Sequence, residues 1–204
     1  MPLSANTPAK LPTGVSRETF ERLEAYCALV QKWNRSINLV SQGDHEVIWS
    51  RHVLDSLRLL PLVPKGVAGG IDLGSGAGFP GLVLALASGV PFSLIESDRR
   101  KAAFLVEAQR VTGAPVHVHC ARIEELCLPP APLVTARALA PLATLLSYAH
   151  RLLCPSGIAL FLKGARAAQE IAAAERHWCM QVDRFDDSQH PGSTILAVSG
   201  LTPA

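Results

Sequence analysis

The stretch DLGSGAGFPG, residues 72–81, is the part of this 204-residue chain that says most about its fold. The short apolar run of residues 68–73, which leads into this stretch, is typical of a buried strand. Residues 81–87, at its end, have a helical pattern. Glycines at such a strand-to-helix junction let the backbone turn sharply and approach a ligand that a Cβ atom would exclude. The stretch therefore predicts a ligand-binding loop at the end of the first strand of an α/β domain.

Two classes of cofactor fit this loop. Gly76, Gly78 and Gly81 match the dinucleotide pattern G-x-G-x-x-G, and Glu96 follows about 20 residues later at the end of a second apolar run. S-adenosylmethionine carries a sulfonium and an ammonium and no phosphate, so the acidic Asp72 just before the first glycine favours it, whereas a carboxylate there would repel a pyrophosphate. Glu96 does not discriminate, because a carboxylate at that place accepts hydrogen bonds from the ribose of either cofactor. Asp72 thus favours S-adenosylmethionine, and an NAD(P)-dependent oxidoreductase stays as the alternative.

From residue 67 onwards, short apolar runs alternate with helical stretches, which predicts a mainly parallel sheet with helices on both faces. The expected strands are 68–73, 91–96, 116–120, 133–136, 158–162, 179–185 and 194–198. The expected helices are 81–87, 101–111, 141–153 and 166–178. The last two strands should form an antiparallel hairpin through residues 189–192. The pattern predicts a Rossmann-like class I S-adenosylmethionine-dependent methyltransferase fold with a seven-stranded sheet.

Helical patterns also precede the first strand. Ser16 is suited to cap a helix, and apolar residues then recur at helical spacing at Phe20, Leu23, Cys27, Val30 and Ile37. A second helical stretch covers 45–60, and the Pro and Gly residues of 61–70 mark a boundary. We expect a flexible tail over 1–15, an N-terminal helical extension over 16–66 and a methyltransferase domain over 67–204.

Composition excludes several classes of protein. Hydrophobic residues make up 49% and charged residues 18% of the chain, and its apolar runs are too short to span a bilayer, so we expect a cytoplasmic protein with no membrane partner. The net charge of +2 permits a polyanionic partner without requiring one. Five scattered cysteines argue against a disulfide framework. His117 and His119 share a strand face, but no further pair at ligand spacing accompanies them, so no metal site is expected.

Several short motifs, taken together, resemble one bacterial family. They are Trp33-Asn34 with Asn38-Leu39, RHVLDS (51–56), the 72–81 loop, Phe104-Leu105, Arg122-Ile123-Glu124, Arg137-Ala138 and Lys163-Gly164. The family is ribosomal RNA small subunit methyltransferase G, also called glucose-inhibited division protein B, whose members methylate guanine N7 in 16S ribosomal RNA. The Phe-Pro-Gly end of the loop and the Arg-His-x-x-Asp-Ser block are its most specific parts. The family usually has Lys-Arg after the second strand, where this chain has Arg99-Arg100-Lys101.

The resemblance implies S-adenosylmethionine as cofactor and 16S ribosomal RNA as partner, within the small ribosomal subunit or an assembly intermediate. It implies that Gly74 and Phe79 contact the cofactor, that Ile123 and Glu124 lie beside its adenine, and that Arg137 lies near the reacting end. A glycine permits close approach, and an aliphatic side chain suits adenine packing. With the residues of the loop and second strand, the expected cofactor set is Asp72, Gly74, Gly76, Gly78, Phe79, Glu96, Ile123, Glu124 and Arg137. We expect a monomer.

Methyl transfer to guanine N7 needs no base, because N7 carries an unprotonated lone pair. Positioning and a cation near guanine O6 should supply most of the rate, and Arg137 and Lys163 are the candidate catalytic residues. No Asn-Pro-Pro-Tyr or Asp-Pro-Pro-Tyr motif, typical of enzymes that methylate exocyclic amines, follows the fourth strand. A non-enzymatic RNA-binding module is a further alternative, which the intact glycine loop disfavours.

Two other motifs have a structural interpretation. His52 is predicted to pair with Asp55 across a helical turn and to clamp the front helices to the catalytic domain. Trp33 and Trp49 are expected to pack in the core rather than to stack on RNA bases.

Overall fold

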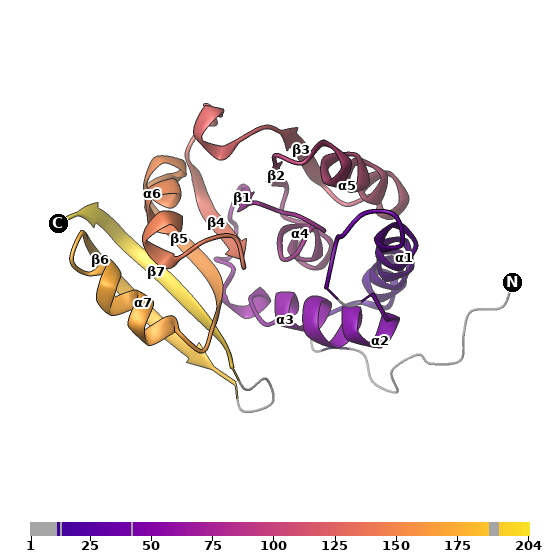
Figure 1. Ribbon diagram of the computed structural model, residues 1–204, viewed down its shortest axis with the longest axis horizontal. Helices are drawn as coiled ribbons and strands as arrows, with labels where there is room; N and C mark the ends of the chain where they lie inside the picture. The colour runs from indigo at the N-terminus through magenta and orange to yellow at the C-terminus, as the bar shows by residue number, and fades with distance from the viewer. Residues whose placement is uncertain (1–11, 13, 42, 188–191) are drawn as a thin grey trace, which may run out of the picture.

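The computed structural model describes residues 12, 14–41, 43–187 and 192–204. Within these residues, one sheet has seven strands in the order β3-β2-β1-β4-β5-β7-β6 (Figure 1). The strands are β1 (Gly70–Leu73), β2 (Phe92–Glu96), β3 (Val116–Cys120), β4 (Ala131–Arg137), β5 (Leu153–Gly164), β6 (Trp178–Asp186) and β7 (Ser193–Pro203). The first five pair in parallel, and β7 runs antiparallel to both β5 and β6. The predicted fold class is confirmed.

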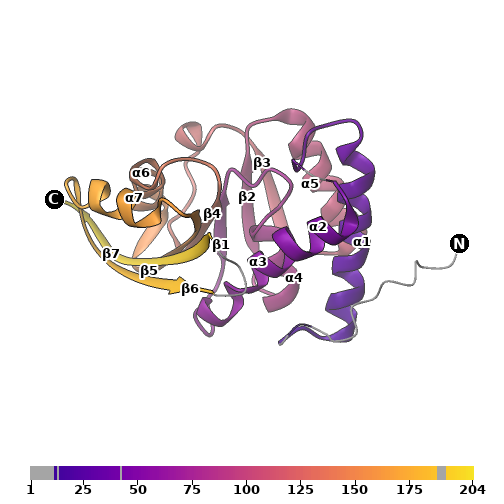
Figure 2. The ribbon, with the colours of Figure 1, turned by 60° about the horizontal axis from the view of Figure 1, so that its bottom comes forward.

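Helices cover both faces of this sheet (Figures 1 and 2). One face carries α1 (Arg17–Asn34), α4 (Gly81–Ser88) and α5 (Arg99–Thr112), and the other carries α6 (Leu142–Leu152) and α7 (Ala167–Ala174). Successive side chains of a strand point to opposite faces. Leu133 therefore lies in the core under α1, α4 and α5, whereas Val134 lies in the core under α6 and α7.

The first helix begins where the sequence indicates. The Ser16 hydroxyl accepts a hydrogen bond from the Thr19 amide at 3.1 Å and caps α1. The helix ends at Asn34, so the expectation that it reaches Ile37 is wrong. The Asn34 side-chain oxygen accepts from the amides of Leu39 and Val40 at 2.8 and 3.0 Å, which folds the chain back and still packs Ile37 against the core.

The second helical stretch is not one regular helix. It consists of α2 (His45–Ile48), a π-helical turn η1 (Trp49–Val53) and α3 (Leu54–Leu57), and the 3-10 turn η2 (Leu60–Leu62) follows. Trp49 is buried with its ring against Phe20, and Trp33 packs on Phe104, as the sequence predicts.

Several boundaries differ from those expected. The helix predicted over 166–178 ends at Ala174, because Trp178 pairs with Pro203 and opens β6. β5 and β7 are much longer than 158–162 and 194–198. β5 begins at Leu153, which pairs with Ala131 of β4, and β7 continues to Pro203, which pairs with Trp178 of β6. The antiparallel pairing of the last two strands is confirmed, but most of the turn predicted over 189–192 lies outside the described residues, as does most of the predicted tail.

Among the residues that the structure describes, none of the helices combines the length and the hydropathy needed to cross a bilayer.

Candidate functional site

A cavity of about 430 Å³ opens at the carboxyl ends of β1, β2 and β4, within the size range of small-molecule sites. This is the edge where ligands of open parallel sheets collect. Seven of the predicted site residues line the cavity: Gly74, Gly76, Phe79, Glu96, Ile123, Glu124 and Arg137. Three others, Asp72, Gly78 and Lys163, do not. The fold therefore gathers most of the predicted set around one hollow.

The glycine-rich loop forms one wall of the cavity. Gly74 and Gly76 have φ values of +60° and +56°, which L side chains rarely adopt. A Cβ atom on Gly74 would lie 2.4 Å from the Leu139 side chain, which also lines the cavity. Gly78 faces α1 instead, where a Cβ atom would lie 2.8 Å from the Tyr26 hydroxyl oxygen. Gly74 and Gly76 thus shape the ligand side of the loop, and Gly78 shapes its packing side.

Glu96 ties the loop to the end of β2. One carboxylate oxygen accepts from the Gly76 amide at 2.8 Å, and the other accepts from the Asp98 amide at 2.8 Å. The residue is only 7% exposed, yet it lines the cavity. A carboxylate has about four acceptor positions, so Glu96 keeps lone pairs for hydroxyl groups of a ligand.

Asp72 lies on the sheet beneath the loop and does not reach the cavity. Its Oδ1 accepts from the Thr135 hydroxyl at 2.6 Å, while Oδ2 is buried without a partner among the described residues. Burial raises the pKa of Asp72 to about 6, although the hydrogen bond from Thr135 and the nearby Ser75 hydroxyl and Gly81 amide oppose the shift. The absence of a Cβ atom on Gly81 makes the room for this carboxylate, because such an atom would lie 2.5 Å from the Asp72 Cβ.

The 3-10 turn η3 (Ile123–Glu125), which follows β3, lines another part of the cavity. Ile123 is 8% exposed and gives an apolar surface. Tyr148 of α6 donates its hydroxyl to Glu124, and this bond holds the pKa of the Glu124 carboxyl below its usual range. Tyr148 also lines the cavity, and sequence reasoning missed it because only the packing of α6 beside β4 brings it there.

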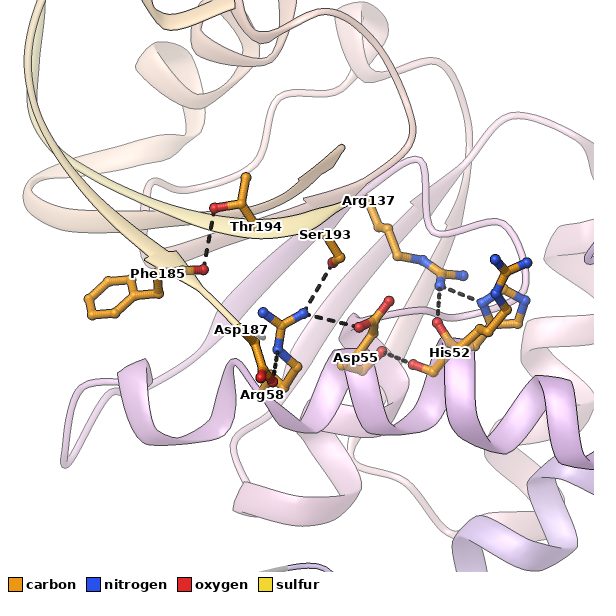
Figure 3. Close-up of polar contacts among 10 residues, drawn as sticks. His52, Asp55, Arg58, Arg137, Phe185, Asp187, Ser193 and Thr194 are labelled. Atoms are coloured by element: carbon orange, nitrogen blue, oxygen red, sulfur yellow. Dashed lines mark hydrogen bonds and ion pairs between the residues drawn. The ribbon is translucent and has the colours of Figure 1, made fainter. Parts of the chain in front are cut away.

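Arg137, the last residue of β4, is held from three sides. Its Cζ lies 5.0 Å from the centre of the Phe79 ring, and its Nη1 lies 2.6 Å from His52 Nδ1 and 3.3 Å from the Arg51 carbonyl oxygen (Figure 3). The predicted pairing of His52 with Asp55 is wrong, because Asp55 accepts from Arg58 at 3.1 Å. η1 turns the His52 ring towards β4 instead, so His52 contacts the end of this strand through Arg137.

Lys163 is engaged away from the cavity. Its Nζ lies 2.7 Å from a Glu170 carboxylate oxygen and donates to the Ala140 carbonyl oxygen at 3.0 Å, and its side chain is 8% exposed. The same Glu170 oxygen accepts from the Leu142 amide at 2.7 Å. These contacts hold the loop of residues 138–141, in which Ala138 has a φ of +49°.

The rim of the cavity carries side chains that are outside the predicted set of site residues. Leu39, positioned by Asn34, and Leu139, which is 38% exposed, both line the cavity. Lys101 and Arg122 contribute positive charge to the lining. Asp98 caps α5 by accepting from the Lys101 amide at 3.3 Å, which fixes the start of this basic helix at the cavity.

Within the described ranges, no group of three or more His, Cys, Asp and Glu side chains is arranged to hold a metal ion. His117 and His119 lie together on β3, with ring centres 4.5 Å apart.

Comparison with known proteins gives a family and a fold. The model of the family described as rRNA small subunit methyltransferase G matches residues 19–193. The chain is 52% identical to "Ribosomal RNA small subunit methyltransferase G" of Rhodospirillum centenum, over 93% of this chain and 88% of the relative. It is 51% identical to the protein of the same name from Granulibacter bethesdensis, over 93% and 89%.

Among solved structures, an O-methyltransferase from Bacillus cereus in complex with SAH superposes with a TM-score of 0.59 at 14% identity, covering 94% of this chain and 93% of that one. At this identity the likeness concerns the fold alone.

Proposed function

Because the chain belongs to the rRNA small subunit methyltransferase G family, we propose that it transfers the methyl group of S-adenosylmethionine to N7 of a guanine in 16S ribosomal RNA. The match of the family model over residues 19–193, which include the whole lining of the cavity, carries this proposal. The oxidoreductase alternative has no support from the comparisons. The enzyme acts in the cytoplasm as a monomer, on the small ribosomal subunit or on an assembly intermediate.

The residues around the cavity fit S-adenosylmethionine. Glu96 would accept hydrogen bonds from the ribose hydroxyls, and Ile123 with Glu124 would adjoin the adenine. Gly74 and Gly76 leave the backbone open to the amino-acid part, because neither has a Cβ atom to exclude it. When bound, the cofactor supplies an electrophilic methyl group on its sulfonium.

The residues of the chain then have to align the accepting base, since N7 needs no proton removed. Arg137 is the candidate to contact it, because a guanidinium has five donors and its contacts with His52 and the Arg51 carbonyl both run through Nη1. A donor directed at guanine O6 offsets the positive charge that develops on the purine and leaves N7 free. Lys163 acts as a positioning residue through the 138–141 loop, which follows Arg137 directly.

The test uses labelled S-adenosylmethionine and small ribosomal subunits that lack the modification, with free 16S RNA in parallel. The label should map to one guanine by N7-specific strand cleavage, and label on protein or on another base atom would refute the proposal. Arg137→Lys keeps a positive charge but loses the fork of donors, and it should lower kcat by about 100-fold or more. Arg17→Ala, a change of a side chain 86% exposed on α1, is the matched control and should retain full activity.

A further inference from the structure

His52 is 85 residues from Arg137 in sequence, and yet it makes the shortest polar contact of that side chain. The His52 ring also packs on Phe79 with ring centres 5.1 Å apart, and Phe79 lies under the Arg137 guanidinium. The three side chains therefore form one cluster, in which Phe79 and Arg137 line the cavity. Figure 3 shows the contact between His52 and Arg137.

The geometry defines the chemical state of the imidazole. A guanidinium carries donors only, so His52 Nδ1 must accept and the ring must be neutral, with its proton on Nε2. Nε2 is buried and has no partner in the described part of the chain. Burial, followed by the nearby charge of Arg137, lowers the pKa of His52 to about 4. At neutral pH the imidazole is thus a fixed acceptor.

The segment that carries His52 is shaped for this contact. η1 is a π-helical turn, a feature found frequently at functional sites. Within it, the Arg51 carbonyl accepts from Arg137 at 3.3 Å, and the His52 carbonyl accepts from the Ser56 hydroxyl at 2.6 Å. The Arg51 carbonyl oxygen and His52 Nδ1, both from η1, therefore contact the same Arg137 nitrogen. These contacts restrict the rotation of a side chain that is otherwise long and flexible.

We propose that His52 is a positioning residue for methyl transfer, whose Nδ1 accepts from Arg137 and orients the guanidinium towards the accepting base. The inference rests on the proposed function, because it assigns Arg137 to the base. It predicts that the acceptor atom of His52, rather than the bulk of its ring, sustains turnover.

Two substitutions separate these properties. His52→Phe keeps a ring against Phe79 but removes the acceptor, and His52→Asn keeps an acceptor close to the place of Nδ1 but removes the ring. His52→Phe should lower kcat by about 10- to 100-fold, the range expected when a hydrogen bond to a charged group is lost. The KM for RNA and the affinity for S-adenosylmethionine by calorimetry should change little. His52→Asn should retain most of the activity, whereas His52→Gln, whose amide lies further out, should behave like His52→Phe.

A second readout does not depend on turnover. Nitrogen-15 NMR of arginine side chains, with Arg137 assigned through Arg137→Lys, should show hindered rotation at its Nη atoms in the wild type and in His52→Asn, and free rotation in His52→Phe. Free rotation in the wild type, or equal activities of the Asn and Phe variants, would overturn the proposal. If His52→Phe does not fold, the activities of His52→Asn and His52→Gln are compared instead, and equal activities would overturn the proposal. If the wild-type protein methylates no RNA, only the proposed function is refuted. The NMR test of the contact between His52 and Arg137 does not require methylation.

Discussion

Asp72 holds a carboxylate on the buried side of the glycine-rich loop, where it is fully shielded from solvent. The Thr135 hydroxyl and the more distant charge of Arg137 favour the ionised form, but burial outweighs them and raises the pKa to about 6. Asp72 is therefore ionised at neutral pH. A charge in a poorly polarisable interior acts over a longer range than one in water, so Asp72 favours a cationic ligand in the cavity without contacting it.

This buried carboxyl predicts a specific dependence of stability on pH. The folded protein binds the Asp72 proton more tightly than the unfolded chain does, whose carboxyl has the ordinary pKa of 3.8. The stabilisation that comes from the protonated Asp72 is therefore fully present below pH 4 and is lost as the pH rises to 6. Above that pH, the effect of Asp72 on the free energy of unfolding stays constant. The difference between a pKa of 3.8 and one of about 6 corresponds to roughly 3 kcal/mol.

Urea unfolding of Asp72→Asn from pH 4 to pH 7 checks this, because the variant keeps an acceptor for Thr135 and cannot ionise. Over that range, the free energy of unfolding of the wild type should fall by roughly 3 kcal/mol more than that of the variant. Asp183→Asn, at an exposed position on β6, is the control and should follow the wild type. An unchanged pH profile of Asp72→Asn would contradict the burial argument.

A substitution at Gly74 tests whether the cofactor binds on the cavity side of the glycine-rich loop. Gly74→Val forces a β-branched residue to a φ of +60° and puts its Cβ against Leu139 at the cavity wall, so S-adenosylmethionine binding should be abolished in calorimetry. Gly89→Val is a matched control, because Gly89 has a φ of +72° with nothing within 4 Å of a Cβ atom. Each variant should lose about 1–2 kcal/mol of stability from backbone strain, but Gly89→Val should bind the cofactor normally. Normal binding by Gly74→Val would argue that the cofactor does not occupy this cavity.

Among the secondary-structure elements, the contact between α3 and the β6–β7 hairpin joins segments far apart in sequence. Arg58, which caps the end of α3, donates to Asp55 and to Ser193 at 3.1 Å each and lies 3.4 Å from an Asp187 oxygen (Figure 3). Its side chain is only 13% exposed, so these bonds are partly protected from water. Ser193 pairs with Gly164 across the sheet, next to Lys163. One arginine thus connects the front helices to the strand ends near the 138–141 loop.

Removing this side chain should loosen the hairpin. Arg58→Ala should lower the free energy of unfolding by about 2–3 kcal/mol, because it leaves Asp55 without the cation that it faces. Hydrogen exchange should rise at the amides of residues 193–195. Arg17→Ala breaks the exposed pair with Glu21 and should cost less than 1 kcal/mol, as is usual at the surface. Equal effects of the two substitutions would show that Arg58 adds no more than a surface charge.

At the scale of the whole molecule, the N-terminal helices and the sheet share one hydrophobic core. Leu23, Tyr26 and Val30 of α1 are completely buried in the same cluster as Leu82 of α4 and Phe104 of α5. Tyr26 also donates to the Ala77 carbonyl in the glycine-rich loop. We therefore propose that the helical extension over 16–66 and the methyltransferase domain over 67–204 fold as one cooperative unit.

Tryptophan fluorescence can test this cooperativity. Trp178→Phe leaves Trp33 and Trp49, both in the N-terminal helical part, as the tryptophans of the chain. Urea unfolding of this variant should give the same midpoint by fluorescence as by far-ultraviolet circular dichroism, which reports on all elements. A fluorescence transition at lower urea would mean that the helical extension unfolds on its own.

The order of the elements and the place of the cavity follow from the amino-acid sequence. Local rules act on neighbouring residues, so the glycines of 72–81, the cap at Ser16 and the apolar runs of the parallel strands could be interpreted without tertiary information. Because the carboxyl ends of parallel strands meet at one edge, the residues that follow β1, β2 and β3 were bound to lie close together.

Which side chains meet at that edge depends on the packing of the folded chain. Arg137 contacts His52 rather than a sequence neighbour, Lys163 pairs with Glu170, and Tyr148 of α6 reaches Glu124 of η3. The ends of β5, β6 and β7 were set by strand pairing in the same way. Such contacts depend on how layers pack and on which polar groups burial leaves in need of a partner, and local sequence patterns do not encode these properties.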